Sequence, residues 1–303
     1  MLKALKYRLL LITFVSSFVQ LSCCTTNSVK NSDIDNELIE ECKELFIDVA
    51  QIEFIKGIIN SIGVITHELG HVIAAKSLWD IDEPIQIHIG TRTPKKTSPL
   101  FSFGNMHFYK NMPWKEGITV LSEKFRFDTC RNVDLGIMSA AGGLTASALM
   151  YGLLAAITGY CAYCDDKNLS EITLKSFLNA SSPFSYILNT KVLSYKQKRF
   201  LINATFIICL ILIFNIFYGC TPFRKYGDGM QLWNRCMGVS GIPLKIVRIL
   251  STLGVWSCWI MLIKEYYEAR KKLSPKDSNV SIIIALVFSR VIYYQIASEL
   301  DCK

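Results

Sequence analysis

The chain has 303 residues, of which 51% are hydrophobic and only 19% are charged. This composition argues against an ordinary soluble enzyme, because several apolar runs approach the roughly 20 residues needed to cross a bilayer. The net charge of +8 falls between those runs, without a basic stripe interleaved with aromatic residues. We therefore expect a lipid bilayer and not a nucleic acid as the partner of this charge.

The N-terminal residues 1–24 begin with basic side chains and continue into an almost wholly apolar run at 9–21. A charged start followed by a short apolar core is typical of a signal peptide, and an uncleaved N-terminal anchor is the alternative. Residues 25–53 are polar and acidic, and we expect them to form a juxtamembrane segment in water.

The first predicted core helix covers residues 54–79 and contains the sequence His67-Glu68-Leu69-Gly70-His71. In a helix, His67 and His71 lie one turn apart on the same face, so both imidazoles can bind one metal ion. A bound Zn²⁺ lowers the pKa of water to about 7, and Glu68 is then the candidate general base. The alternative is a helix with ordinary polar residues near a surface. Ionisable groups in so apolar a stretch are costly unless they have a function.

Residues 80–132 have a pattern typical of strands. Side chains alternate with period two at 85–89 and more loosely at 100–109, and prolines interrupt the segment, which predicts short strands or hairpins. His88 and His107 lie on these predicted strands. Neither has a partner at metal-ligand spacing, so we interpret both as surface or packing residues.

Further apolar segments at 133–163 and 200–218 predict the second and third spans. Residues 140–148 are dense in small side chains, which allow helices to approach closely. Two more apolar segments, at 246–263 and 280–296, predict C-terminal transmembrane helices within 236–303. A basic cluster between them is expected to face solvent and lipid headgroups: Arg270, Lys271, Lys272 and Lys276.

A catalytic zinc site usually needs a third protein ligand. The soluble pattern HExxHxxGxxH fails here, because Ala74 replaces its glycine. Asp228 lies between Gly227 and Gly229, a pattern that taken alone favours a turn, with a carboxylate that can approach a metal as the alternative. If the first predicted helix runs inward and the next two alternate, His71 and Asp228 lie at the same side of the membrane.

With these motifs, the chain resembles the site-2-type intramembrane zinc metalloproteases over about residues 54–235. That family combines HExxH in its first core span with an Asp-Gly pair after the third, and often has a β-rich insertion between the first two. The resemblance implies His67, His71 and Asp228 as zinc ligands and Glu68 as the base. Two family motifs are only partly present. The Gly-Pro-x-x-Asn motif corresponds at best to residues 142–146, which lack its proline and asparagine. Of the motif Asn-x-x-Pro-x-Pro-x-Leu-Asp-Gly, only Pro222, Asp228 and Gly229 remain.

We therefore expect a mainly α polytopic membrane protein with a three-helix catalytic core, a small β-rich insertion at 80–132 and additional C-terminal transmembrane helices. The expected function is zinc-dependent cleavage of transmembrane segments of membrane-protein substrates, as in regulated intramembrane proteolysis, in a bacterial inner membrane. A substrate helix must unwind to be cleaved, which pairing with the strands at 85–109 would assist. The alternatives are a catalytically silent membrane scaffold of the same fold and a membrane metal transporter or sensor.

Overall fold

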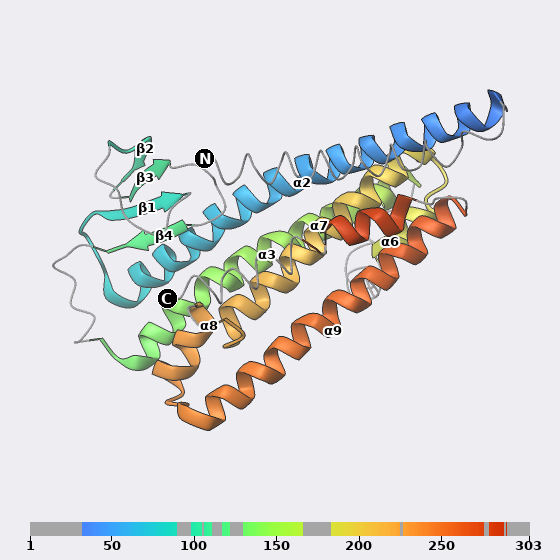
Figure 1. The fold of residues 1–303 in the computed structure, drawn as a ribbon. Helices are drawn as coiled ribbons and strands as arrows, with labels where there is room; N and C mark the ends of the chain where they lie inside the picture. Colours follow the sequence, from blue (N-terminus) through green and yellow to red (C-terminus); the bar gives the residue numbers. More distant parts are fainter. Residues whose placement is uncertain are drawn as a thin grey trace. The chain divides into compact units, whose positions relative to one another are not determined.

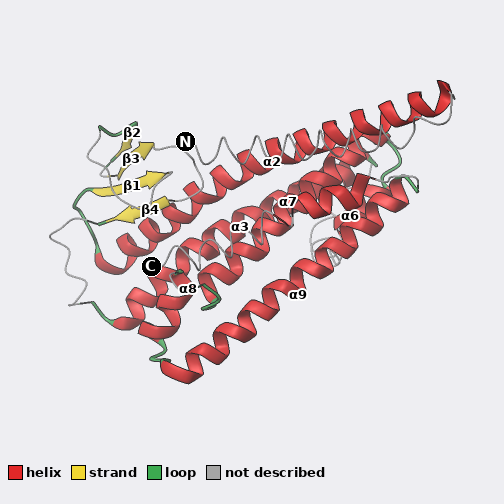
Figure 2. Cartoon of the chain, viewed as in Figure 1, coloured by secondary structure: helices red, strands yellow, loops and turns green. Residues whose placement is uncertain are grey.

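A computed structural model describes residues 32–89, 98–104, 106–110, 117–121, 130–165, 183–224, 227–275, 279–287 and 289. The signal or anchor predicted at 1–24 lies outside these described residues. The chain divides into two compact units, residues 1–46 and residues 47–303. All the interactions discussed below lie within the second unit. Apart from one small sheet, the described elements are helical (Figure 2).

Helix α2, Ser32–Trp79, is much longer than the predicted first core helix (Figure 1). It begins at Ser32 because the acidic segment before residue 54, expected as a juxtamembrane stretch, contains good helix formers and neither glycine nor proline. It ends at Asp80, which has a left-handed φ of 47° and whose backbone N–H donates to the Lys76 carbonyl at 3.1 Å. The histidine motif lies near this C-terminal end.

The predicted β-rich insertion forms a four-stranded sheet in the order β2-β3-β1-β4. Its strands are β1 (Ile85–Ile89), β2 (Phe101–Phe103), β3 (Met106–Lys110) and β4 (Gly117–Val120). Strands β1 and β3 are parallel, and the other two pairs are antiparallel. The loosely alternating segment at 100–109 is thus a hairpin, which turns at Gly104 with a φ of 58° that glycine readily adopts.

The sheet is attached to α2 through an apolar core. The isoleucines of β1, Ile85, Ile87 and Ile89, are buried in one cluster with Val72 and Ala75 of α2. Because side chains alternate along a strand, these isoleucines share one face and His88 lies on the other. The packing fixes the sheet beside the turn of α2 that carries the histidine motif.

Three described helices are long and apolar enough to cross a membrane, which indicates a membrane protein. They are α3 (Asn132–Cys164), α7 (Tyr195–Cys220) and α9 (Gly241–Leu273). The first two match the predicted second and third spans in position, and α9 extends the predicted segment 246–263 at both ends. Helix α2, which carries the histidine motif, is not among the three.

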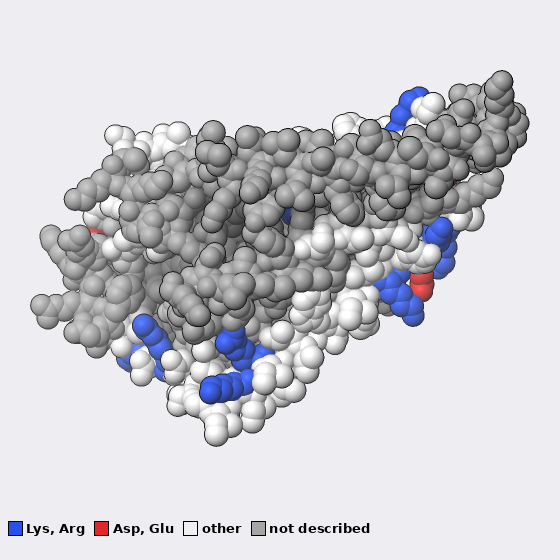
Figure 3. All heavy atoms as spheres, in the orientation of Figure 1, with Lys and Arg blue, Asp and Glu red and all other residues white. Residues whose placement is uncertain are grey.

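Helices α3 and α7 approach closely through small residues, as the run at 140–148 predicted. A Cβ atom at Gly143 would lie only 2.6 Å from the Cα atom of Gly219. Near the described C-terminus, residues 279–287 are helical, and the rest of the predicted span 280–296 lies largely outside the described residues. Lys and Arg side chains gather near both ends of α9, with uncharged surface between them (Figure 3), which fits a membrane span.

The expectation that Arg270 faces lipid headgroups is wrong. Its side chain is fully buried and donates to Asp48 Oδ2 at 2.7 Å, and Arg199 of α7 donates to the same oxygen at 2.6 Å. Asn203 bridges the two ends of this cluster, accepting from Arg270 and donating to Asp48. Asp48 belongs to the segment that was expected to lie in water. It is buried because it pairs with Arg199 of α7 and Arg270 of α9, which are far from it in the sequence.

Candidate metal centre

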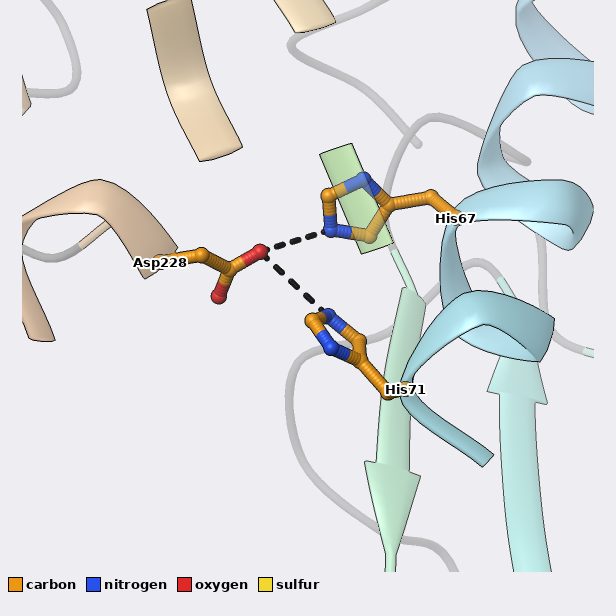
Figure 4. A group of neighbouring side chains, drawn as sticks. All are labelled: His67, His71 and Asp228. Carbon is orange, nitrogen blue, oxygen red and sulfur yellow. Dashed lines mark hydrogen bonds and ion pairs between the residues drawn. The ribbon is translucent and has the colours of Figure 1, made fainter. Parts of the chain in front are cut away.

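Three side chains from two distant parts of the chain meet beside the C-terminal end of α2. His67 and His71 project from one face of that helix toward Asp228, which is the first residue of α8 (Asp228–Gln231) (Figure 4). Asp228 Oδ2 lies 2.8 Å from His67 Nε2 and 3.3 Å from His71 Nε2. The three side chains are only 12–16% exposed, so they form a largely buried polar group.

The two glycines that flank Asp228 explain how its carboxylate reaches the histidines. Gly227 has extended backbone geometry and precedes the first turn of α8. Gly229 lies directly against the backbone of Thr221, where any side chain would collide. The segment that follows, the π-helical turn η2 (Leu232–Cys236), is held to the end of α7 by the Trp233 indole, which donates to the Cys220 carbonyl at 2.9 Å. The turn and the ligand interpretations of this motif are therefore compatible.

Two imidazoles and a carboxylate are ligand types that zinc takes. Among the described residues, these three side chains form the one group of histidine, cysteine or carboxylate ligands gathered around a common point, with ligand atoms within 4.8 Å of one another. Tetrahedral zinc with ligands at 2.0–2.2 Å needs ligand atoms about 3.4 Å apart, and the Asp228 oxygen lies 2.8 Å and 3.3 Å from the two histidine nitrogens. His71 Nδ1 lies 2.8 Å from the Met138 carbonyl. A proton on Nδ1 makes that bond and leaves the lone pair of Nε2 for a metal.

Glu68 is held by the sheet, which the sequence did not indicate. Its side chain is buried, and Thr119 Oγ1 donates to Glu68 Oε2 at 2.8 Å and approaches the Glu68 carbonyl at 3.2 Å. Thr119 lies on β4, opposite Ile87 of β1. The β-rich insertion thus reaches the candidate general base directly, and the contact engages only one of its two carboxylate oxygens.

Helix α7 contributes Tyr218, which lies beside His67, and Asn215, which lies earlier in the same helix. The ring of Tyr218 lies 5.5 Å, centroid to centroid, from that of His67. The Asn215 amide donates to the Ile211 carbonyl of its own helix at 3.0 Å. Asn215 is therefore engaged in a bond within its own helix.

The other two histidines lie on the sheet and outside the three-residue group. His88 is fully buried, stacks on Tyr109 with ring centroids 4.3 Å apart, and has Nε2 3.1 Å from the Gln86 side chain. Burial lowers the pKa of His88 below its ordinary value. His107 Nδ1 lies 2.8 Å from the Ser102 hydroxyl. These contacts fit the packing role expected for both residues.

The arrangement brings a candidate metal-binding triad together with a buried carboxylate, and these are the groups that activation of water against a carbonyl group requires. Comparison with protein-family models, with curated proteins and with solved structures finds no match to this chain.

Proposed function

We propose that the protein is an intramembrane zinc metalloendopeptidase, which hydrolyses peptide bonds in transmembrane segments of other membrane proteins. The observation that carries the proposal is the position of the Asp228 carboxylate, within 3.3 Å of a ring nitrogen of both His67 and His71. A third ligand from a separate helix converts a two-histidine motif into the ligand set of a catalytic zinc site. The three apolar helices support a multi-pass membrane location, and we propose that the membrane is a bacterial inner membrane.

In the proposed reaction, His67, His71 and Asp228 would hold the zinc ion. When bound, zinc supplies a Lewis acid that lowers the pKa of water to about 7 and polarises the substrate carbonyl. Glu68 accepts a proton from the attacking water as the water oxygen bonds to the carbonyl carbon. When the carbon–nitrogen bond breaks, Glu68 donates that proton to the leaving amine, so water is the only co-reactant.

The sheet offers a way to present an unwound substrate. A helical substrate conceals its carbonyl groups in hydrogen bonds, and an extended segment can satisfy its backbone by joining a sheet edge. Strand β1 is flanked on both sides and has no free edge, whereas β4 is an outer strand of the described sheet. Because Thr119 of β4 touches Glu68, we propose that substrate pairs along β4 and not along β1.

The test is the substitution Glu68→Gln in the full chain, with bound zinc and cleavage both measured. A suitable substrate is a membrane protein with one tagged transmembrane helix that contains helix-breaking glycines. We expect Glu68→Gln to retain zinc and to lose cleavage, because the amide cannot accept the proton. The matched control is Glu53→Gln on the same helix, which should leave both unchanged. Cleavage by Glu68→Gln at the wild-type rate, with zinc retained, would exclude Glu68 as the base.

A further inference from the structure

Gly142 places a residue without a side chain directly beside the metal centre. Gly142 lies within α3, although glycine is a poor helix former. A Cβ atom at this position would lie 2.5 Å from Nε2 of His71 and 2.8 Å from Nε2 of His67. Both nitrogens are the atoms that the proposed zinc ligation requires, so α3 presents bare backbone to the ligand atoms themselves.

We propose that Gly142 is a positioning residue of the metal centre: its lack of a side chain keeps both imidazole nitrogens aimed at Asp228. This inference rests on the proposed function, since it assumes that those nitrogens bind zinc. An alanine at position 142 would demand space that the Nε2 atoms occupy. The imidazoles lie at the ends of side chains that can rotate, so we expect them to turn away and leave the helices in place.

The neighbouring Gly143 makes a contrasting contact. A Cβ atom there would lie 2.6 Å from Gly219 Cα and 2.7 Å from the Asn215 carbonyl oxygen. These are backbone atoms of α7, which cannot move unless the whole helix moves. Two adjacent glycines on one helix therefore have separable roles: Gly142 accommodates the metal ligands, and Gly143 allows α3 and α7 to pack closely.

A third glycine supplies a matched control on the same helix. The structure places nothing within 4 Å of a Cβ atom at Gly152. An alanine there adds the same methyl group to α3 without meeting a neighbour. Any effect common to Gly142→Ala and Gly152→Ala would then arise from helix propensity, which alanine improves, and not from the metal centre.

The experiment compares these three alanine variants as full-length proteins in detergent. Zinc affinity is measured by competition with a chromophoric chelator, and thermal unfolding is measured after metal removal with EDTA. We expect Gly142→Ala to weaken zinc binding by at least about tenfold, as displaced ligand orientation does at other metal sites, with a metal-free melting temperature near that of wild type. Gly143→Ala should lower the metal-free melting temperature. Gly152→Ala should leave zinc affinity unchanged and should not lower the melting temperature, because alanine is the better helix former.

Three outcomes would overturn the inference. One is zinc binding by Gly142→Ala as tight as that of wild type. Another is a loss of metal-free stability as large as that of Gly143→Ala, which would make the role of Gly142 general helix packing. A wild-type protein that binds no zinc would overturn both this inference and the proposed function. A wild-type protein that binds zinc but cleaves no transmembrane substrate would contradict the proposed function alone, because the affinity comparison remains valid.

Discussion

The Asp228 carboxylate lies 2.8 Å from Nε2 of His67, although 161 residues separate the two along the chain. This relationship requires α7 to return the chain to the histidine face of α2 and the glycines around Asp228 to permit a tight turn. The flanking Gly229 contacts the Thr221 backbone, where a side chain has no room. The Asp-Gly pair therefore places the carboxylate and is more than a local turn signal.

The substitution Gly229→Ala tests this placement. The added methyl group collides with the Thr221 backbone, so α8 must shift and move Asp228 away from the histidines. We expect zinc affinity to fall by about tenfold or more, measured by chelator competition. A substitution at Gly238 is a poor control, because its positive φ of 66° would strain any other residue. The better control is Gly159→Ala on α3, which meets no neighbour. Equal zinc affinity in Gly229→Ala and Gly159→Ala would contradict this placement.

Thr119 is predicted to orient Glu68 through its hydroxyl group. Thr119→Val keeps the branched shape and removes the bond to Glu68 Oε2, so we expect kcat to fall by about tenfold while zinc content stays unchanged. Thr119→Ser retains the hydroxyl and should restore most of the rate. The measurement is steady-state cleavage of the tagged transmembrane substrate. If the serine variant were as impaired as the valine variant, shape and not hydrogen bonding would be the cause.

The buried charge cluster is predicted to stabilise the bundle through Asp48. Its carboxylate accepts from both Arg199 and Arg270, so Asp48→Asn leaves buried guanidinium groups without their counter-charge. We expect a loss of about 3–5 kcal/mol in the free energy of unfolding, measured by denaturant titration in detergent. Glu44→Gln, at an exposed position of the same helix, should have little effect. A comparable loss in both variants would refute a specific role for Asp48.

His88 is predicted to make the stability of the sheet region depend on pH. Burial lowers the pKa of His88 in the folded protein, so the unfolded chain binds the proton more readily. His88 therefore contributes a stability that is present above its unfolded pKa of about 6.5 and is lost as the pH falls below that value. The measurement is unfolding at pH 7.5 and pH 5.5, for wild type and His88→Phe. The phenylalanine variant should lose less stability on acidification, and an equal loss would contradict the assignment.

The sequence was informative where function depends on local spacing. Helical periodicity alone places His67 and His71 on one face, and alternation alone located β1. The contact of Asp228 with the histidines could not be derived from local spacing, because it depends on how three segments pack together. Thr119 was missed because its bond to Glu68 depends on the register between β4 and β1. Arg270 was misassigned because a basic run looks solvated until its buried partner, Asp48, is known.

Zinc affinity decides whether Asp228 is a metal ligand. It is measured in wild type, in Asp228→Ala and in Asp82→Ala, which changes an exposed aspartate beyond the end of α2. If Asp228 and the two histidines form one metal centre, wild type and Asp82→Ala will bind about one zinc ion per chain. Asp228→Ala will bind zinc at least tenfold more weakly. Wild-type affinity in Asp228→Ala would contradict the claim.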